Sequence, residues 1–175
     1  IVRNMLLNPT RIGFMNVLEK INIQTNISNQ HYIHGELCGD VEFISSPINS
    51  FEVPAYIIPS IIDEIPILAV LAAFGDGKTI FNRVEELKFK ESNRLQAIID
   101  NLENFGTNAY KEDNSLIVEG GHPTMATVQS FDDHRIAMAF IVLSIAAFGE
   151  YEIDNKECIN ISLPGFFNTI EVMLS

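Results

Sequence analysis

The sequence is poor in cations and cysteine, and it contains no tryptophan. Its 175 residues include 11 Lys and Arg against 23 Asp and Glu, a formal net charge of −12. A protein that binds nucleic acid needs a basic face to neutralise phosphates, so this composition argues against a nucleic-acid partner. The two cysteines, Cys38 and Cys158, are too few for a disulfide framework and fit a reducing compartment such as the cytoplasm.

Long apolar runs are missing as well. The longest run, residues 136–148, is interrupted only by Ser144 and is shorter than the roughly 20 residues of a membrane-spanning helix. A second run, residues 65–74, is shorter still. The first residues lack the apolar core of a signal peptide. We therefore expect a cytoplasmic protein without a membrane partner, in which both runs form buried helices.

The sequence does contain an alternation of strand and helix patterns. At 47% hydrophobic and 19% charged residues, the chain has the composition of a folded domain. Glycines at 75 and 106 end two stretches with apolar residues at helical spacing. The pattern predicts strands at 53–56 and 78–84, helices at 58–74 and 91–105, and strands at 108–111 and 116–118. The order over this stretch is β-α-β-α-β-β.

Parts of the same order recur before and after this stretch. The patterns predict a helix at 10–21 with strands at 23–28 and 41–44, then a strand at 126–130, a helix at 133–148, a strand at 151–153 and a helix at 164–174. Ala-Ala-Phe-Gly occurs at both 72–75 and 146–149. We infer an α/β fold of nearly three β-α-β-α-β-β units, at about 1–50, 51–121 and 122–175. The first unit lacks its opening strand and helix, and the last lacks its closing strands.

A glycine-rich segment, Gly-Asp-Gly-Lys-Thr at residues 75–79, has a partial likeness to a phosphate-binding loop. The P-loop pattern requires a further glycine, and that position holds Ala72. A P-loop also follows a strand and precedes a helix, whereas this segment follows a predicted helix and precedes a strand. We therefore interpret it as a helix end and a turn.

Three cations stand close together near the start of the predicted helix at 91–105, namely Lys88, Lys90 and Arg94. Lys90 and Arg94 lie four residues apart across a helix N-terminus, where free backbone N–H groups favour an anion. The alternative is an ordinary helix start, in which Glu91 suits the helix dipole and Arg94 is solvated. The spacing alone leaves both interpretations open.

The next buried helix begins with Asp133-His134-Arg135. Arg135 directly precedes an apolar run, so we expect it at the rim of the core, where it can share an anion with Arg94. The alternative is an Asp N-cap with incidental neighbours, His134 being an ordinary hydrogen-bonded histidine. A metal site is disfavoured because no second His or Cys stands nearby at ligand spacing.

Asp63 and Glu64 interrupt an otherwise apolar stretch. A buried, unpaired carboxylate is costly, so one of the two must face solvent or enter a polar pocket. Either residue can be an acid in the first turn of a helix. The functional alternative is a general base whose pKa is set by burial and by nearby cations.

Together these motifs resemble the EPSP synthase (3-phosphoshikimate 1-carboxyvinyltransferase) family. The resemblance rests on Ile-Asp-Glu-Ile-Pro at 62–66, the segment 85–94 that ends Lys-Glu-Ser-Asn-Arg, Asp-His-Arg-Ile-Ala-Met-Ala at 133–139 and Pro-Gly-Phe-Phe at 164–167. It implies the enolpyruvate transferase fold, with two globular domains of three such units each and the active site between them. The chain then forms part of the C-terminal domain, without the N-terminal domain, of a protein expected to be a monomer when whole.

The resemblance also implies a reaction that uses no metal and no organic cofactor. The family transfers the enolpyruvyl group of phosphoenolpyruvate to the 5-hydroxyl of shikimate 3-phosphate and releases phosphate. By resemblance, Asp63 contacts the shikimate hydroxyls and acts as the base, and Glu91 moves the proton at the methylene carbon. Lys90 binds near the shikimate substrate, and Arg94 and Arg135 hold phosphoenolpyruvate.

The chain departs from the family's pattern at one position and in its extent. Some members carry a phosphoenolpyruvate-binding Lys where this chain has Ile161, so we assign no such contact. Without an N-terminal domain we expect the chain alone to be inactive. One alternative is a non-catalytic remnant or a domain that binds an anion without turnover. Another is a UDP-N-acetylglucosamine enolpyruvyl transferase, but that family lacks the two motifs that this chain has at 90–94 and 133–135.

Overall fold

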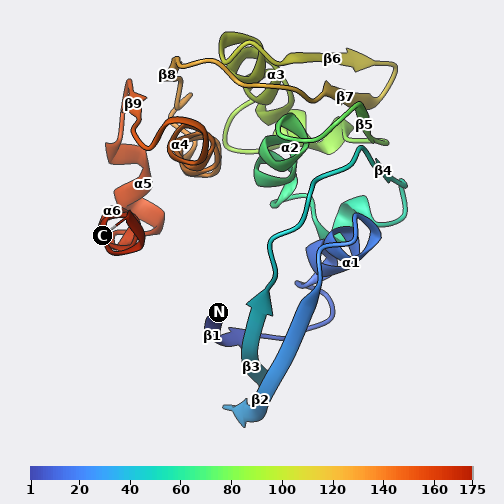
Figure 1. Cartoon of the computed structure of the whole chain (residues 1–175), viewed down its shortest axis with the longest axis vertical. Helices are drawn as coiled ribbons and strands as arrows, with labels where there is room; N and C mark the ends of the chain where they lie inside the picture. The colour runs from blue at the N-terminus through green and yellow to red at the C-terminus, as the bar shows by residue number, and fades with distance from the viewer. Residues whose placement is uncertain (175) are drawn as a thin grey trace.

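The computed structural model describes residues 1–174 and has a mixed α/β fold with three small sheets. The first sheet contains β1 (Val2–Leu6), β2 (Thr25–Ile33) and β3 (Glu36–Phe43), in the order β1-β3-β2 with antiparallel pairing. Helix α1 (Gly13–Lys20) follows β1. In Figure 1 this sheet projects downward, below α1 and the remaining helices.

The second sheet contains β4 (Glu52–Val53), β5 (Lys78–Phe81), β6 (Asn108–Glu112) and β7 (Ser115–Glu119), in the order β4-β5-β7-β6. Strand β4 runs parallel to β5, and the other pairs are antiparallel. Helix α2 (Ile65–Ala73) joins β4 to β5, and α3 (Arg94–Asn104) joins β5 to β6. Apart from short 3-10 turns, this is the β-α-β-α-β-β order that the sequence predicts.

The third part of the chain has a parallel pair of strands, β8 (Thr127–Val128) and β9 (Glu152–Ile153), joined by α4 (His134–Phe148). Helices α5 (Glu157–Ser162) and α6 (Phe166–Leu174) follow. Among residues 1–174, no helix is long and apolar enough to cross a membrane. Figure 1 places α4, α5 and α6 on one side of the molecule, beside α2.

The core lies where α2, α3 and α4 pack together. Helices α2 and α4 are in contact, and α3 packs against both. The rings of Phe105 and Phe140 stack between these elements, with centroids 6.2 Å apart, and both are fully buried. The two apolar runs are therefore buried helices, as the sequence predicts.

The predicted helix at 58–74 is wrong in its first half. Only a short 3-10 helix, η1 (Ile58–Ser60), forms there, and α2 begins at Ile65. Pro66 has no N–H to donate, and its ring would clash with the carbonyl of Ile62 in a continuous helix. The break leaves Asp63 in the turn that precedes α2.

The predicted helix at 91–105 also begins late. Asn93 is the N-cap, and its side chain accepts a hydrogen bond from the backbone N–H of Gln96 at 3.3 Å. This is the position where Asn is strongly preferred. Lys90 and Glu91 therefore precede the helix instead of lying in its first turn, and they follow a 3-10 helix, η2 (Glu85–Phe89).

Two elements, β1 and α5, were not predicted, and the strands at 23–28 and 41–44 are parts of a longer hairpin, β2–β3. His34 and Gly35 form its two-residue turn, with φ angles of 49° and 87°. A turn with two positive φ angles matches the twist of the strands, but His-Gly is a weak signal for it in sequence. The predicted strand at 78–84 ends at Phe81.

Gly120 provides a test of the packing of α2 against the second sheet. A Cβ atom on Gly120 would lie 2.1 Å from the carbonyl oxygen of Gly75 and 2.5 Å from that of Ala72. Gly120→Ala is therefore expected to lower the free energy of unfolding by about 1–3 kcal/mol, as overpacked sites do. The matched control is Gly121→Ala, where a Cβ atom meets nothing within 4 Å. Equal urea midpoints for the two variants would contradict the close approach.

Candidate active site

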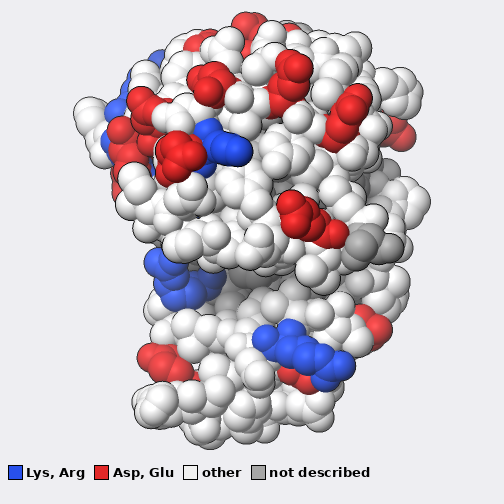
Figure 2. All heavy atoms as spheres, turned by 90° about the vertical axis from the view of Figure 1, so that its left-hand side faces the viewer, with Lys and Arg blue, Asp and Glu red and all other residues white. Residues whose placement is uncertain are grey.

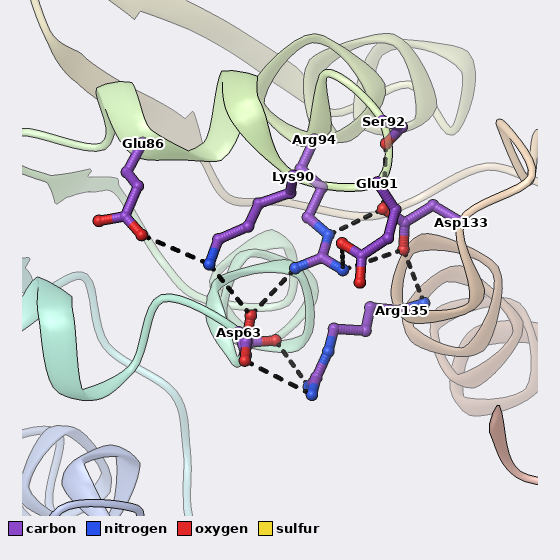
Figure 3. Close-up of polar contacts among 8 residues, drawn as sticks. All are labelled: Asp63, Glu86, Lys90, Glu91, Ser92, Arg94, Asp133 and Arg135. Atoms are coloured by element: carbon purple, nitrogen blue, oxygen red, sulfur yellow. Dashed lines mark hydrogen bonds and ion pairs between the residues drawn. The ribbon is translucent and has the colours of Figure 1, made fainter.

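Three cationic side chains lie within ion-pair distance of the carboxylate of Asp63 (Figure 3). Lys90 Nζ lies 3.6 Å and Arg94 Nη1 lies 3.1 Å from Asp63 Oδ1. Arg135 Nη2 lies 3.6 Å from Asp63 Oδ2, and Arg135 Nη1 donates to the backbone carbonyl of Asp63 at 3.2 Å. These residues come from the turn before α2, the segment before α3, and the starts of α3 and α4, so the fold brings distant segments together.

Arg94 is the buried member of the site. Its side chain is 0% exposed, which rules out the solvated role that was one interpretation of the sequence. Its Nε donates to Asp133 Oδ2 at 2.8 Å, its Nη1 to Asp63 and its Nη2 to Glu91. Every nitrogen of the guanidinium group therefore has a carboxylate partner, an arrangement of strong charge-assisted hydrogen bonds.

Asp133 connects the starts of α3 and α4, and its side chain is also 0% exposed. Besides Arg94, its carboxylate accepts from Ser92 Oγ at 3.1 Å and from the backbone N–H of Arg135 at 2.9 Å. It is thus the N-cap that the sequence suggests, and in addition the main partner of Arg94. The sequence alone reveals neither this pairing nor the contact of Ser92. The available signal is an acidic N-cap three residues before the apolar run that begins at Ile136.

The carboxyl groups of the partly buried Asp63 and the buried Asp133 are both held in the ionised form. Burial by itself raises the pKa of Asp63, but Arg135, Lys90 and Arg94 outweigh it and hold that pKa below its ordinary value. Burial likewise opposes the charge of Asp133, and the hydrogen bond and charge of Arg94 lower its pKa. Asp63 is consequently a weak base in this arrangement of charges.

Glu64 takes a different environment from its neighbour Asp63. Its side chain is half-buried beside α4, and burial raises its pKa. With Asp63, Pro66, Arg135 and Met138 it lines a small pocket of about 150 Å³ next to the ion cluster. Of the two acids in the apolar stretch, Asp63 is therefore the one that enters the polar site.

The outer groups of the site are the ones that a ligand can reach. The side chains of Lys90, Arg135 and Glu91 are 22%, 31% and 53% exposed. Arg135 thus lies at the rim of the core, as predicted. Arg94 and Arg135 converge on Asp63 in this structure, and Glu91 occupies Nη2 of Arg94.

The remaining candidates lie outside this cluster. The glycine-rich segment at 75–79 runs from the end of α2 into β5, which confirms its interpretation as a turn. Ile161 is 88% exposed on α5. Within residues 1–174, no group of three or more His, Cys, Asp or Glu side chains is placed to hold a metal ion.

The buried pair of Arg94 and Asp133 is the expected source of stability at the site. Asp133→Asn leaves Arg94 without its main counter-charge and is expected to lower the free energy of unfolding by about 3–5 kcal/mol. The control is Asp132→Asn, a neighbouring exposed position where a change within about 0.5 kcal/mol is expected. Urea denaturation at pH 7 measures both, and a similar loss for the two variants would exclude the pairing.

The same pair predicts the direction of the pH dependence. Because the pKa of Asp133 is lowered in the folded chain, its stabilisation is complete above the unfolded pKa of about 3.9 and is lost as the pH falls toward the folded pKa. Between about pH 5 and pH 2, the unfolding midpoint should therefore fall more steeply in the unchanged chain than in Asp133→Asn. Parallel curves would show that Asp133 does not titrate in this way.

Comparison with known proteins agrees with the family resemblance of the sequence motifs. The family model for EPSP synthase (3-phosphoshikimate 1-carboxyvinyltransferase) matches residues 1–170. The 3-phosphoshikimate 1-carboxyvinyltransferase of Thermoanaerobacter sp. (strain X514) is 38% identical over 173 residues, which are 98% of this chain and 41% of the relative. That of Caldicellulosiruptor saccharolyticus is 42% identical over 172 residues, or 97% of this chain and 40% of the relative.

Comparison with solved structures leads to the same family as the sequence relatives. EPSP synthase from Acinetobacter baumannii superposes with a TM-score of 0.89 at 28% identity, covering 96% of this chain and 40% of that one. The enolpyruvyl transferase NikO from Streptomyces tendae shares the fold, with a TM-score of 0.61 at 18% identity. The chain thus spans about 40% of the length of the relatives that it matches. On the match to residues 1–170 and these identities, the chain belongs to the EPSP synthase family.

Proposed function

We propose that the whole protein transfers the enolpyruvyl group of phosphoenolpyruvate to the 5-hydroxyl of shikimate 3-phosphate, with release of phosphate. This chain supplies part of the C-terminal domain, and an N-terminal domain outside the chain completes the cleft. The observation that carries the proposal is the meeting of Lys90, Arg94 and Arg135 at the carboxylate of Asp63. The whole protein acts as a cytoplasmic monomer without nucleic-acid or membrane partners.

The cations of the site fit the charges of the two substrates. Both substrates carry a phosphate and a carboxylate, which are the groups that Arg and Lys bind best. Arg135 and Lys90 are partly exposed and meet an incoming anion first. Arg94 joins them once Glu91, which is 53% exposed, turns away from it. In this way Arg94 and Arg135 hold phosphoenolpyruvate, and Lys90 binds beside the shikimate oxygen that reacts.

The reaction then needs a base and an acid, and two carboxylates are placed for these roles. The 5-hydroxyl oxygen bonds to carbon 2 of phosphoenolpyruvate as its proton passes to Asp63. The methylene carbon takes a proton from the protonated form of Glu91 and becomes a methyl group. Phosphate then leaves with the proton that Asp63 had taken from the hydroxyl, while the methyl carbon returns a proton to Glu91 and the double bond is restored.

Substrate binding is expected to make Asp63 a stronger base. The three neighbouring cations lower the pKa of Asp63 and make it a weak base before substrate arrives. When the anionic substrates share those cations, the carboxylate is less stabilised in its charged form, so its pKa rises. The base therefore gains strength when both reactants are in place, as general base catalysis near neutral pH requires.

The test is phosphate release from phosphoenolpyruvate and shikimate 3-phosphate. The purified 175-residue chain is expected to show no turnover, because half of the cleft cannot orient two anions, whereas the protein with its N-terminal domain is expected to turn over. Turnover by the chain alone would refute the need for that domain. A whole protein that binds the anions without turnover would be a non-catalytic remnant. Thermal stabilisation by UDP-N-acetylglucosamine instead of shikimate 3-phosphate would assign the other transferase reaction.

Glu91→Gln in the whole protein separates binding from chemistry. The variant loses the proton-transferring carboxylate, so kcat is expected to fall by about 10²–10⁴-fold. KM for phosphoenolpyruvate is expected to stay or fall, because Gln competes less than Glu with the substrate for Arg94. The control is Glu85→Gln, at a half-buried carboxylate that pairs instead with Arg83, and it should leave both constants unchanged. An increase in KM at unchanged kcat would contradict the assigned role.

A further inference from the structure

The turn that joins β8 to α4 has an unfavourable backbone conformation. Phe131 and Asp132 have φ angles of 52° and 54°, in the left-handed region that residues other than glycine seldom adopt. Such a conformation persists only where the surrounding structure holds it in place. The next residue is Asp133, whose carboxylate is the main partner of Arg94. The groups that hold this turn therefore also determine where Asp133 lies.

Asn101 holds the start of the turn from the side of α3. Its side chain is fully buried, and its amide group bonds to both backbone polar groups of Gln129. Nδ2 donates to the carbonyl oxygen of Gln129 and Oδ1 accepts from its N–H, each at 2.9 Å. Nδ2 also donates to the carbonyl oxygen of Ala97 at 3.0 Å, so both donors of the amide are in use. Asn101 thus pairs with the backbone of Gln129 as a neighbouring strand would.

Asp154 holds the next residue of the same turn from the end of β9. Its Oδ1 accepts a hydrogen bond from the N–H of Ser130 at 2.9 Å. Ser130 is buried, and its carbonyl oxygen accepts from the N–H of Asp133 at 3.0 Å. Its Oγ accepts from the N–H of Asp132 at 3.3 Å. A single residue therefore connects the carboxylate of Asp154 to the backbone of Asp133.

Helix α3 contacts both ends of the segment 129–133. Arg94 and Asn101 are seven residues apart, about two helical turns, and so lie on one face of α3. Arg94 bonds to the last residue of the segment, and Asn101 bonds to the first. One helix thus sets the distance between the two ends of the turn, and with it the position of the Asp133 carboxylate.

Asn104 provides a contact of the same kind outside the turn. It lies at the end of α3, is exposed, and donates from Nδ2 to the carbonyl oxygen of Thr127 in β8 at 3.0 Å. This bond joins the same helix to the same part of the chain, but it ends two residues before Gln129. If Asn101 served only to attach β8 to α3, substitutions of the two asparagines would have the same kind of effect.

We propose that Asn101 and Asp154 are positioning residues of the active site, which act by holding the turn before α4 in its strained conformation. The turn fixes the carboxylate of Asp133, which orients the guanidinium group of Arg94 and caps the start of α4, where Arg135 lies. When either support is lost, the turn relaxes and Asp133 shifts relative to both arginines. The effect on phosphoenolpyruvate binding rests on the proposed function, whereas the link to Asp133 does not.

The first experiment measures hydrogen exchange at the backbone N–H of Arg135 in the whole protein, because this group donates to Asp133 Oδ1 at 2.9 Å. Asn101→Leu keeps the size of the side chain and removes its hydrogen bonds, so exchange at Arg135 is expected to become about tenfold faster. The control, Asn104→Leu, should leave it unchanged. Equal effects of the two substitutions would overturn the proposal. So would an increase of the same size at the buried amides of α2, which reports a general loss of stability.

The second experiment changes Asp154, which is exposed, and it tests the proposal even where Asn101→Leu does not fold. Asp154→Ala removes the acceptor of the Ser130 N–H, whereas Asp154→Asn removes the charge and keeps an oxygen at that position. Acidic side chains are scattered over the upper part of the face that β9, α5 and α6 form (Figure 2), so the loss of one negative charge there is not expected to destabilise the fold. Asp154→Asn is therefore the matched control.

KM for phosphoenolpyruvate in the whole protein is expected to rise about 5–10-fold in Asp154→Ala and to stay within about twofold in Asp154→Asn. KM for shikimate 3-phosphate should stay unchanged in both, and exchange at the Arg135 N–H should be faster only in Asp154→Ala. Equal exchange in the two variants, or equal KM values in an active protein, would refute the proposal. No turnover by the unchanged protein would refute the proposed reaction instead, and the exchange measurement would then alone decide the positioning role.

Discussion

The site depends on one buried guanidinium group, that of Arg94. A charge that is 0% exposed is unfavourable unless carboxylates compensate it, and three of them do: Asp133, Asp63 and Glu91. These partners come from the start of α4, the turn before α2 and the segment before α3. The charge of Arg94 is therefore compensated only when all of these segments are in place, and the same arrangement sets the positions of Lys90 and Arg135.

The apolar helices provide the frame for this ion cluster. Helices α2 and α4 pack against each other, α3 packs against both, and the polar groups of the site lie at the N-terminal ends of the three helices. Pro66 delays the start of α2, so Asp63 lies in a turn instead of within a helix. Asn93 caps α3, so the helix begins at Arg94, and Lys90 and Glu91 precede it. Asp63, Lys90 and Glu91 thus lie just before helix starts, whereas Arg94 and Arg135 lie in the first turns of α3 and α4.

In this acidic chain, the cationic side chains of the site lie beside carboxylates that compensate their charge. Lys90, Arg94 and Arg135 share the cluster with the carboxylates of Asp63, Glu91 and Asp133, and Glu86 pairs with Lys90 at 3.4 Å. The chain's own carboxylates hold the cations in position and limit their mutual repulsion. Of the carboxylates that contact Arg94, Glu91 is 53% exposed, whereas Asp133 is fully buried and keeps Arg94 oriented.

The sequence alone predicted the α/β class, the two buried helices and the β-α-β-α-β-β order. It also gave the candidate site residues Asp63, Lys90, Glu91, Arg94 and Arg135. These follow from local periodicity, helix end signals and short motifs, which depend on neighbouring residues. It did not reveal the late starts of α2 and α3, the strand β1 or the role of Asp133. The burial of Arg94 and the convergence of three cations on Asp63 depend on the packing of α2, α3 and α4, which brings together residues up to 72 positions apart. Local patterns in the sequence carry no information on contacts over such separations.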